Sequence, residues 1–174
     1  HDLLDETLDR LEKLYEAGEG ITGTPTGFID LDELLSGLQP SALIIVGARP
    51  AMGKTAFALN VAAHAAVREQ KPTLIFSLEM GHLELTQRML CSEANVDAKN
   101  MRDGKLNDDD WNRISNGIGR LADAPMWIDD NPNLTIMEIR AKARRLKSQA
   151  GGLGLIVVDY LQLMSGRAGA ENRQ

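Results

Sequence analysis

An apolar run that ends in a glycine-containing turn constrains this 174-residue chain more than any other feature. Residues 43–46, Leu-Ile-Ile-Val, have the composition of a buried strand, and residues 47–53 follow as a turn containing Gly and Pro. Lys54 and Thr55 then open a segment with helical composition. We therefore expect a strand, a tight loop and a helix in direct succession, as at the start of a parallel α/β unit.

The residue types in this loop are those that bind phosphate. Gly53 lets the backbone approach phosphate oxygens closely, so that main-chain N–H groups and the dipole of the following helix point at them. Lys54 can reach the outer phosphates, and the hydroxyl of Thr55 can ligate Mg²⁺. Ala48 stands where this pattern usually has Gly, which is a small departure; a flexible surface turn is the alternative interpretation. The predicted binding loop for a nucleoside triphosphate consists of Ala48, Arg49, Pro50, Ala51, Met52, Gly53, Lys54 and Thr55.

Two acidic residues each follow an apolar run elsewhere in the chain. Asp159 ends the run 153–158, and a carboxylate at the end of a parallel strand can hold Mg²⁺ opposite Thr55. Glu79 follows the run 73–78, and at the same edge of a sheet it could act as general base for a water near the outer phosphate. The alternatives are a strand-end turn for Asp159 and an acid at a helix start for Glu79.

Composition limits the class of protein. With 43% apolar residues the chain can bury one substantial core, and we expect one compact domain with an appendage. Lys and Arg number 19 against 25 Asp and Glu, so net charge alone does not indicate nucleic-acid binding. The single Cys91 predicts a packed thiol in a reducing compartment. Because neither a signal peptide nor a long apolar stretch is visible, we expect a cytoplasmic protein without a membrane span.

The first 20 residues read as an amphipathic linker helix. Leu4, Leu8 and Leu11 share one stripe within Leu3–Ala17, and Gly18 follows. Residues 19–26 look like a linker because they are rich in Gly, Thr and Pro. The pattern shows an apolar face but not its partner, so docking on its own domain and docking on a neighbouring subunit remain open.

The remaining chain, 21–174, alternates strands with helices, which predicts a parallel sheet flanked by helices. Thr135 and Glu138 form a capping-box pattern, and we expect Asn107 or Asp108 to cap the helix that carries Trp111. We expect that helix to turn its apolar stripe, Trp111, Ile114, Ile118 and Leu121, to the core rather than to stacked bases. The expected strands are 43–46, 73–77, 126–129 and 155–158, and the expected helices are 54–69, 82–94, 108–121 and 136–148.

A basic cluster lies within the last expected helix, and an apolar-poor tail follows residue 164. A solvated helix face is one explanation of the cluster, and contact with DNA or a partner is the other. We expect the tail to be mobile because it lacks apolar residues able to anchor it. The cluster consists of Arg140, Lys142, Arg144, Arg145 and Lys147.

Four segments together resemble a known family. They are 24–32 (Thr-Pro-Thr-Gly-Phe-Ile-Asp-Leu-Asp), 47–55 (Gly-Ala-Arg-Pro-Ala-Met-Gly-Lys-Thr), 76–80 (Phe-Ser-Leu-Glu-Met) and 158–164 (Val-Asp-Tyr-Leu-Gln-Leu-Met). In combination they are similar to bacterial replicative DNA helicases of the DnaB type, and the resemblance spans nearly the whole chain.

This resemblance implies a RecA-like P-loop NTPase fold preceded by a linker helix. It implies ATP hydrolysis with Mg²⁺, 5′ to 3′ translocation on single-stranded DNA at replication forks, and a homohexamer with primase and a helicase loader as partners. Lys54 and Thr55 would bind phosphate and Mg²⁺, Glu79 would polarise the attacking water, and Asp159 would organise the metal. Residues 1–20 would dock on the neighbouring subunit.

The family's further strands, sensor residue and arginine finger have no counterpart in these residues. We therefore expect a partial ATPase domain that ends shortly after the strand carrying Asp159. A RecA-fold recombination or repair ATPase and a nonhydrolytic assembly fragment remain alternatives.

Overall fold

In the computed structural model, residues 4–5, 7–9, 11–12 and 20–160 are described. Three parallel strands form a sheet in the order β2-β1-β3, so the predicted parallel sheet is confirmed. In the register of this sheet, Thr73 lies between Met126 on one neighbour and Leu155 on the other. The strands are β1 (Thr73–Ser77), β2 (Met126–Asp129) and β3 (Leu155–Asp159).

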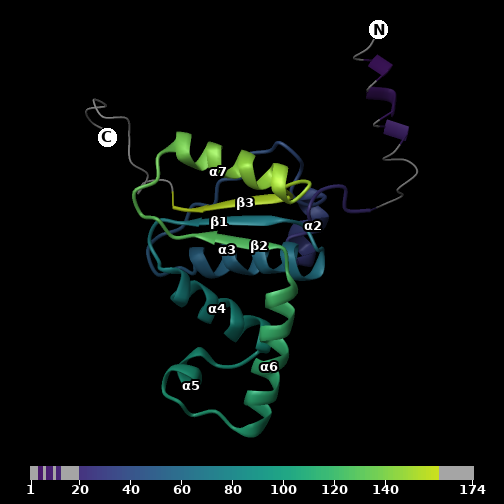
Figure 1. Cartoon of the computed structure of the whole chain (residues 1–174). Helices are drawn as coiled ribbons and strands as arrows, with labels where there is room; N and C mark the ends of the chain where they lie inside the picture. The colour runs from purple at the N-terminus through teal and green to yellow at the C-terminus, as the bar shows by residue number, and fades with distance from the viewer. Residues whose placement is uncertain (1–3, 6, 10, 13–19, 161–174) are drawn as a thin grey trace.

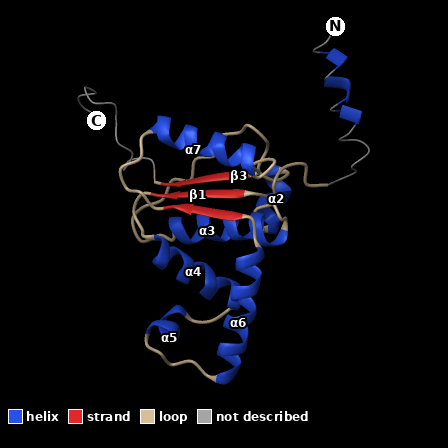
Figure 2. Cartoon of the chain, viewed as in Figure 1, coloured by secondary structure: helices blue, strands red, loops and turns tan. Residues whose placement is uncertain are grey.

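Helices cover both faces of the sheet (Figure 1). Helix α7 (Ile136–Gln149) packs on one face, while α3 (Lys54–Ala63) and α4 (His82–Ala94) pack on the other. Beyond α4, the short α5 (Ala98–Arg102) and the longer α6 (Asp108–Asp123) form a lobe that projects from the sheet, as the colouring by element type in Figure 2 makes clear.

The central strand β1 holds the two faces together. Ile75 packs with the side chains of α3 and α4, whereas Leu74 and Phe76 pack with Leu134 and the apolar side of α7. All five residues of β1 are buried, as expected for a parallel strand covered on both faces. The alternation of its side chains therefore divides the core into two layers.

Both predicted helix starts are confirmed. The Thr135 side chain accepts from the Glu138 N–H, while the Glu138 carboxylate accepts from the Thr135 N–H. The same carboxylate also accepts from the Thr135 hydroxyl, and the bonds from the Thr135 N–H and hydroxyl hold the pKa of Glu138 below its usual value. Asn107, and not Asp108, caps α6, and it forms a second reciprocal box with Asp110.

The prediction of a strand at residues 43–46 is wrong. In the structure this run has no secondary structure, and Leu43 and Ile45 are 83% and 73% exposed. Apolar composition favours a strand but cannot supply a pairing partner, and here the run does not pair with the sheet. β3 is consequently an edge strand of the described sheet.

The helix predicted over 54–69 is observed as one continuous helical segment over 54–68, made of an α-helix and a π-helix. It changes from α3 to a π-helical turn, η1 (His64–Arg68), whose Ala65 and Ala66 are fully buried. Helix α2 (Ile29–Leu35) and α5 were not predicted, because seven-residue and five-residue helices give little periodic signal.

The expectation that α6 turns its whole apolar stripe inward is only partly correct. Ile114 is 4% exposed and packs with Ala94 and Val96, but Trp111 and Ile118 are 59% and 53% exposed. Since α6 belongs to the projecting lobe, only one side of the helix meets other elements (Figure 1).

The segment predicted as a linker belongs to the folded body from Gly23 onward. Thr24 pairs with Leu38 in an isolated antiparallel bridge, and both Thr24 and Thr26 are buried. Gly27 adopts φ +86°, and a Cβ there would lie 2.6 Å from the imidazole Nδ1 of His64. A glycine is therefore required where this loop packs on η1.

The described parts of the N-terminal segment are helical and lie apart from the sheet (Figure 1). In this segment Leu4, Leu8 and Leu11 are 67%, 57% and 56% exposed. The expected mobile tail lies outside the described residues. Among the helices that are described, none combines the length and apolar character needed to cross a bilayer.

Candidate active site

The carboxyl ends of the three strands carry acidic side chains at one edge of the sheet. β3 ends at Asp159, β2 is followed by Asp130, and Glu79 follows β1 with Leu78 between them. This edge is where parallel α/β sheets place their ligand sites. The topology therefore gathers residues that are far apart in the sequence.

The start of α3 contacts the end of β3 directly. The hydroxyl of Thr55 donates to Oδ2 of Asp159 at 2.7 Å, and Nζ of Lys54 lies 3.3 Å from Oδ1 of the same carboxylate. Asp159 is 6% exposed, so these contacts satisfy a buried charge. The predicted grouping of Lys54, Thr55 and Asp159 is thus observed across 104 residues of sequence.

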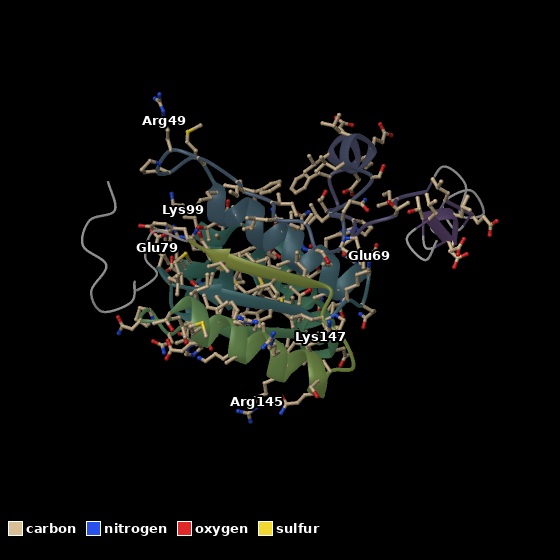
Figure 3. All side chains as sticks on the ribbon, turned by 90° about the horizontal axis from the view of Figure 1, so that it is seen from above. Arg49, Glu69, Glu79, Lys99, Arg145 and Lys147 are labelled. Carbon is tan, nitrogen blue, oxygen red and sulfur yellow. The ribbon has the colours of Figure 1, made fainter. Side chains whose placement is uncertain are left out.

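Glu79 lies at the same edge of the sheet (Figure 3). The N–H of Leu78 donates to the carbonyl oxygen of Asp159 at 2.7 Å. This bond holds the residue before Glu79 against the last residue of β3. The Glu79 side chain is exposed and forms no hydrogen bond or ion pair with another described residue. Its carboxylate is therefore accessible to solvent at the edge where Lys54 and Asp159 meet.

The first part of the predicted loop lies outside this cluster. Residues 48–52 are exposed, and Arg49 points away from the sheet at the tip of the loop (Figure 3). Gly53 has φ +85°, a left-handed conformation that suits glycine, and α3 begins at the next residue. The structure thus brings the last two predicted loop residues to the acids and leaves Ala48, Arg49, Pro50, Ala51 and Met52 apart from them.

Three residues at this edge were not predicted from the sequence. Lys54 lies over the Tyr160 ring, with Nζ 3.8 Å from the ring centroid. Asp130 accepts from the His82 N–H at 2.9 Å and lies 2.8 Å from the His82 Nδ1. The signal that singled out Asp159, an acid at the end of an apolar strand, also marks the end of β2, where Asp129 closes the strand and Asp130 follows it.

The oxygen donors at this edge fit Mg²⁺. Thr55 supplies a hydroxyl and Asp159 a carboxylate, both of which are hard ligands of the kind Mg²⁺ prefers. Within the described residues no group of three or more His, Cys, Asp or Glu side chains could hold a metal alone. Such a pair suits an ion that takes its other ligands from substrate phosphates and water.

The basic cluster of α7 is divided between two sides of the helix. Arg140, Arg144 and Lys147 line a shallow apolar groove of about 330 Å³ beside β3. Lys142 pairs with Asp129 on the other side. Arg145 points outward from the sheet (Figure 3). The five basic residues therefore do not form one continuous surface.

The fold and the edge cluster define a class. A parallel sheet covered by helices, with Gly-Lys-Thr at a helix start beside a strand-end aspartate, is the RecA-like type of P-loop NTPase fold. More narrowly, the chain belongs to the family described as the DnaB-like helicase C-terminal domain, whose model matches residues 23–174. The resemblance drawn from the four sequence segments is thereby confirmed.

Relatives with assigned names agree with this family. The chain is 51% identical to replicative DNA helicase DnaB of Geobacillus stearothermophilus and 48% identical to replicative DNA helicase DnaC of Bacillus subtilis. Each match covers 99% of this chain and 38% of the relative. The chain thus spans well under half the length of these helicases.

Two solved structures have the same fold. The ATPase domain of G40P superposes with a TM-score of 0.89 at 29% identity, covering 97% of this chain and 61% of that one. A DnaB-like replicative helicase, described together with its interactions with primase, gives a TM-score of 0.83 at 29% identity and covers 94% of this chain and 41% of that one. The arrangement of elements is therefore that of helicase ATPase domains.

Proposed function

We propose that this chain is part of the motor domain of a replicative DNA helicase, in which ATP hydrolysis drives 5′ to 3′ movement along single-stranded DNA. The observation that supports this most directly is the contact of Lys54 and Thr55 with Asp159, beside the loop that carries Glu79. The proposal includes a homohexamer, primase and a loader as partners, and a cytoplasmic location at replication forks. Family membership favours it over the recombination ATPase alternative.

Each residue of the cluster has a chemical role in this proposal. Lys54 binds the outer phosphates as a mobile positive charge, and the backbone of 48–53 wraps around them. Thr55 and Asp159 would hold Mg²⁺, which neutralises charge on the phosphate oxygens. Glu79 accepts the proton of the attacking water.

The contacts of Lys54 bear on how nucleotide is admitted. Its ammonium is shared between the Asp159 carboxylate and the Tyr160 ring, and 26% of its side chain is exposed. A phosphate that binds Lys54 has to compete with both groups. Because an ammonium on a four-carbon stem is mobile, Lys54 can exchange these partners without a shift of α3.

Two substitutions test the roles in a full-length helicase carrying these residues. Lys54→Ala is expected to abolish binding of a fluorescent ATP analogue in the presence of Mg²⁺ and to abolish hydrolysis. Glu79→Gln is expected to retain binding and to hydrolyse ATP about a hundredfold or more slowly, because a general base typically contributes this much.

Matched controls separate these effects from general damage. Lys147→Ala removes an exposed lysine of α7, and Glu84→Gln removes an exposed acid of α4 that pairs with Arg88. Both variants should bind and hydrolyse ATP as the wild type does. Wild-type turnover in Lys54→Ala would remove the motor assignment, and wild-type turnover in Glu79→Gln would leave Glu79 without the role of base.

We also propose that residues 1–20 dock on a neighbouring subunit, with 21–174 as a partial ATPase domain. The exposed stripe of Leu4, Leu8 and Leu11 supports this, since an amphipathic helix gains stability by burying its apolar face. Replacing Leu4 and Leu8 by Glu should shift the full-length protein to smaller oligomers in analytical ultracentrifugation. Asp9→Ser in the same segment should not, and unchanged assembly of the double variant would refute the docking.

A further inference from the structure

The direction of the Glu79 carboxylate depends on the backbone around it. Glu79 lies in the loop 78–81 between β1 and α4, and its exposed side chain has no hydrogen-bonding or ionic partner among the described residues. No neighbouring side chain therefore fixes the carboxylate. Whatever fixes this four-residue loop therefore sets the backbone position from which the side chain of the proposed base extends.

The first half of the loop is fixed by its own strand and by β3. The Leu78 N–H donates to the carbonyl oxygen of Asp159 at 2.7 Å. The hydroxyl of Ser77 donates to the Met80 carbonyl oxygen at 2.7 Å, and the Met80 N–H lies 3.2 Å from the same hydroxyl oxygen. These bonds close the turn that carries Glu79, but they do not fix its far end.

The far end is fixed by Asp130. Helix α4 starts after Gly81, which has no side chain to cap it, and the Asp130 carboxylate takes that place from 48 residues away. Its Oδ2 accepts from the N–H of His82 at 2.9 Å and lies 2.8 Å from the His82 Nδ1. A carboxylate at a helix N-terminus is favourable because it accepts an otherwise unpaired N–H and faces the positive end of the helix dipole.

The electrostatics of Asp130 agree with this geometry. The hydrogen bond from the His82 N–H, and then that from its imidazole, lower the pKa of Asp130 below the usual value for an aspartate. Asp130 therefore remains an acceptor of both bonds at neutral pH. Asp130 directly follows β2, so the bonds tie the loop after β1 to the end of the adjacent strand.

We propose that Asp130 is a positioning residue for Glu79, which holds the N-terminus of α4 against the end of β2 and thereby sets the loop that carries the base. This inference rests on the proposed function, because it takes Glu79 as the group that accepts the proton of the attacking water. Asp130 contacts neither Lys54 nor Thr55, so it acts on turnover and not on nucleotide binding.

The expected loss of kcat in Asp130 variants follows from the sensitivity of catalysis to the position of the base. A displacement of about 1 Å at a reacting group costs on the order of a hundredfold in rate, and loss of one anchor of a loop held at several points should cost about tenfold. Asp130→Ala is therefore expected to lower kcat for ATP hydrolysis about tenfold while leaving nucleotide affinity unchanged. Asp130→Asn keeps an oxygen that can accept from the His82 N–H, and it should recover most of the rate.

The decisive measurement is a double-mutant cycle with Glu79 in a full-length helicase carrying these residues. A residue that acts through Glu79 has nothing left to position in a Glu79→Gln background. Asp130→Ala should therefore lower kcat in the wild-type background and leave the residual kcat of Glu79→Gln unchanged. A purely structural role would lower kcat in both backgrounds by the same factor, and that result would overturn the proposal.

Further variants make every outcome informative. Asp129→Ala removes the neighbouring carboxylate, which pairs with Lys142 and accepts from the Asn131 N–H, and it should leave kcat unchanged. If Asp130→Ala does not fold, Asp130→Glu displaces the carboxylate by one methylene and should show the same dependence on Glu79. If Glu79→Gln is slow and Asp130→Ala lowers kcat by the same factor in both backgrounds, only the positioning role is refuted. Wild-type turnover in Glu79→Gln would instead refute the role of Glu79 as the base.

Discussion

Asp32 offers the sharpest test of how the loop before α2 is held. The residue is 4% exposed, and its carboxylate accepts from the Thr26 N–H at 2.7 Å, the Thr26 hydroxyl at 2.8 Å and the Gly27 N–H at 3.1 Å. Asp32→Asn keeps one acceptor oxygen for Thr26 but turns an amide NH₂ toward the Gly27 N–H. Hydrogen bonds to charged groups contribute about 1.5–3 kcal/mol each, so we expect Asp32→Asn, which loses one bond, to lower the free energy of unfolding by about 2 kcal/mol and Asp32→Ala, which loses all three, by about 5 kcal/mol.

The same carboxylate predicts a pH dependence with a definite sign. Burial by itself raises the pKa of Asp32, but the hydrogen bonds from Thr26 and Gly27, together with nearby His64, outweigh burial and lower it. A depressed folded pKa means that the stabilisation is fully present above the unfolded pKa of about 3.9 and is lost as pH falls through the folded pKa. The difference between wild type and Asp32→Asn should therefore be constant from pH 7 to about pH 5 and shrink below pH 4.

Guanidinium denaturation followed by circular dichroism measures both effects. Glu33→Gln is the matched control, since Glu33 is the next residue of α2 and is exposed. It should change the free energy of unfolding by less than about 0.5 kcal/mol. If Asp32→Asn falls within the same range at pH 7, or if its deficit grows as the solution is acidified, the account of this carboxylate is wrong.

Three further predictions concern stability and exchange. Asn107→Ala removes the cap of α6 and should cost about 1 kcal/mol in denaturation, while Asn107→Ser should recover most of it. Leu134→Ala empties a fully buried site beneath α7 and should cost about 3 kcal/mol, and a loss below about 1 kcal/mol would contradict its place in the core. Backbone amides of 43–46 should exchange with deuterium far faster than those of 73–77, because only the latter donate within the sheet; equal protection would show that the run is paired.

The parts of the fold that could be predicted from sequence are those with a repeated local signal. The strands at 73–77 and 126–129 match the prediction in both bounds, as does the helix at 82–94, since the strands are short apolar runs and the helix places Leu85 and Met89 at helical spacing. The two capping boxes were readable because their reciprocal bonds span only three residues.

The features that were missed depend on contacts outside the local window. The run 43–46 has strand composition, but composition does not specify which edge, if any, it pairs with. The exposure of Trp111 follows from the projection of the lobe, which no periodicity encodes. Likewise, the grouping of Lys54 with Asp159 was predictable from two strand-end motifs, whereas the bonds between His82 and Asp130 required the order of the strands.

The outer side of β3 has a consequence for how this chain behaves in solution. One row of its main-chain N–H and C=O groups has no strand partner in the described sheet, and the exposed Leu43–Val46 run has the composition of a strand. Such a row of unpaired groups can form hydrogen bonds with a further strand, which comes either from the same molecule or from another copy. We therefore expect the concentration at which the chain self-associates to depend on whether β3 pairs with residues 43–46 of its own chain or with another copy.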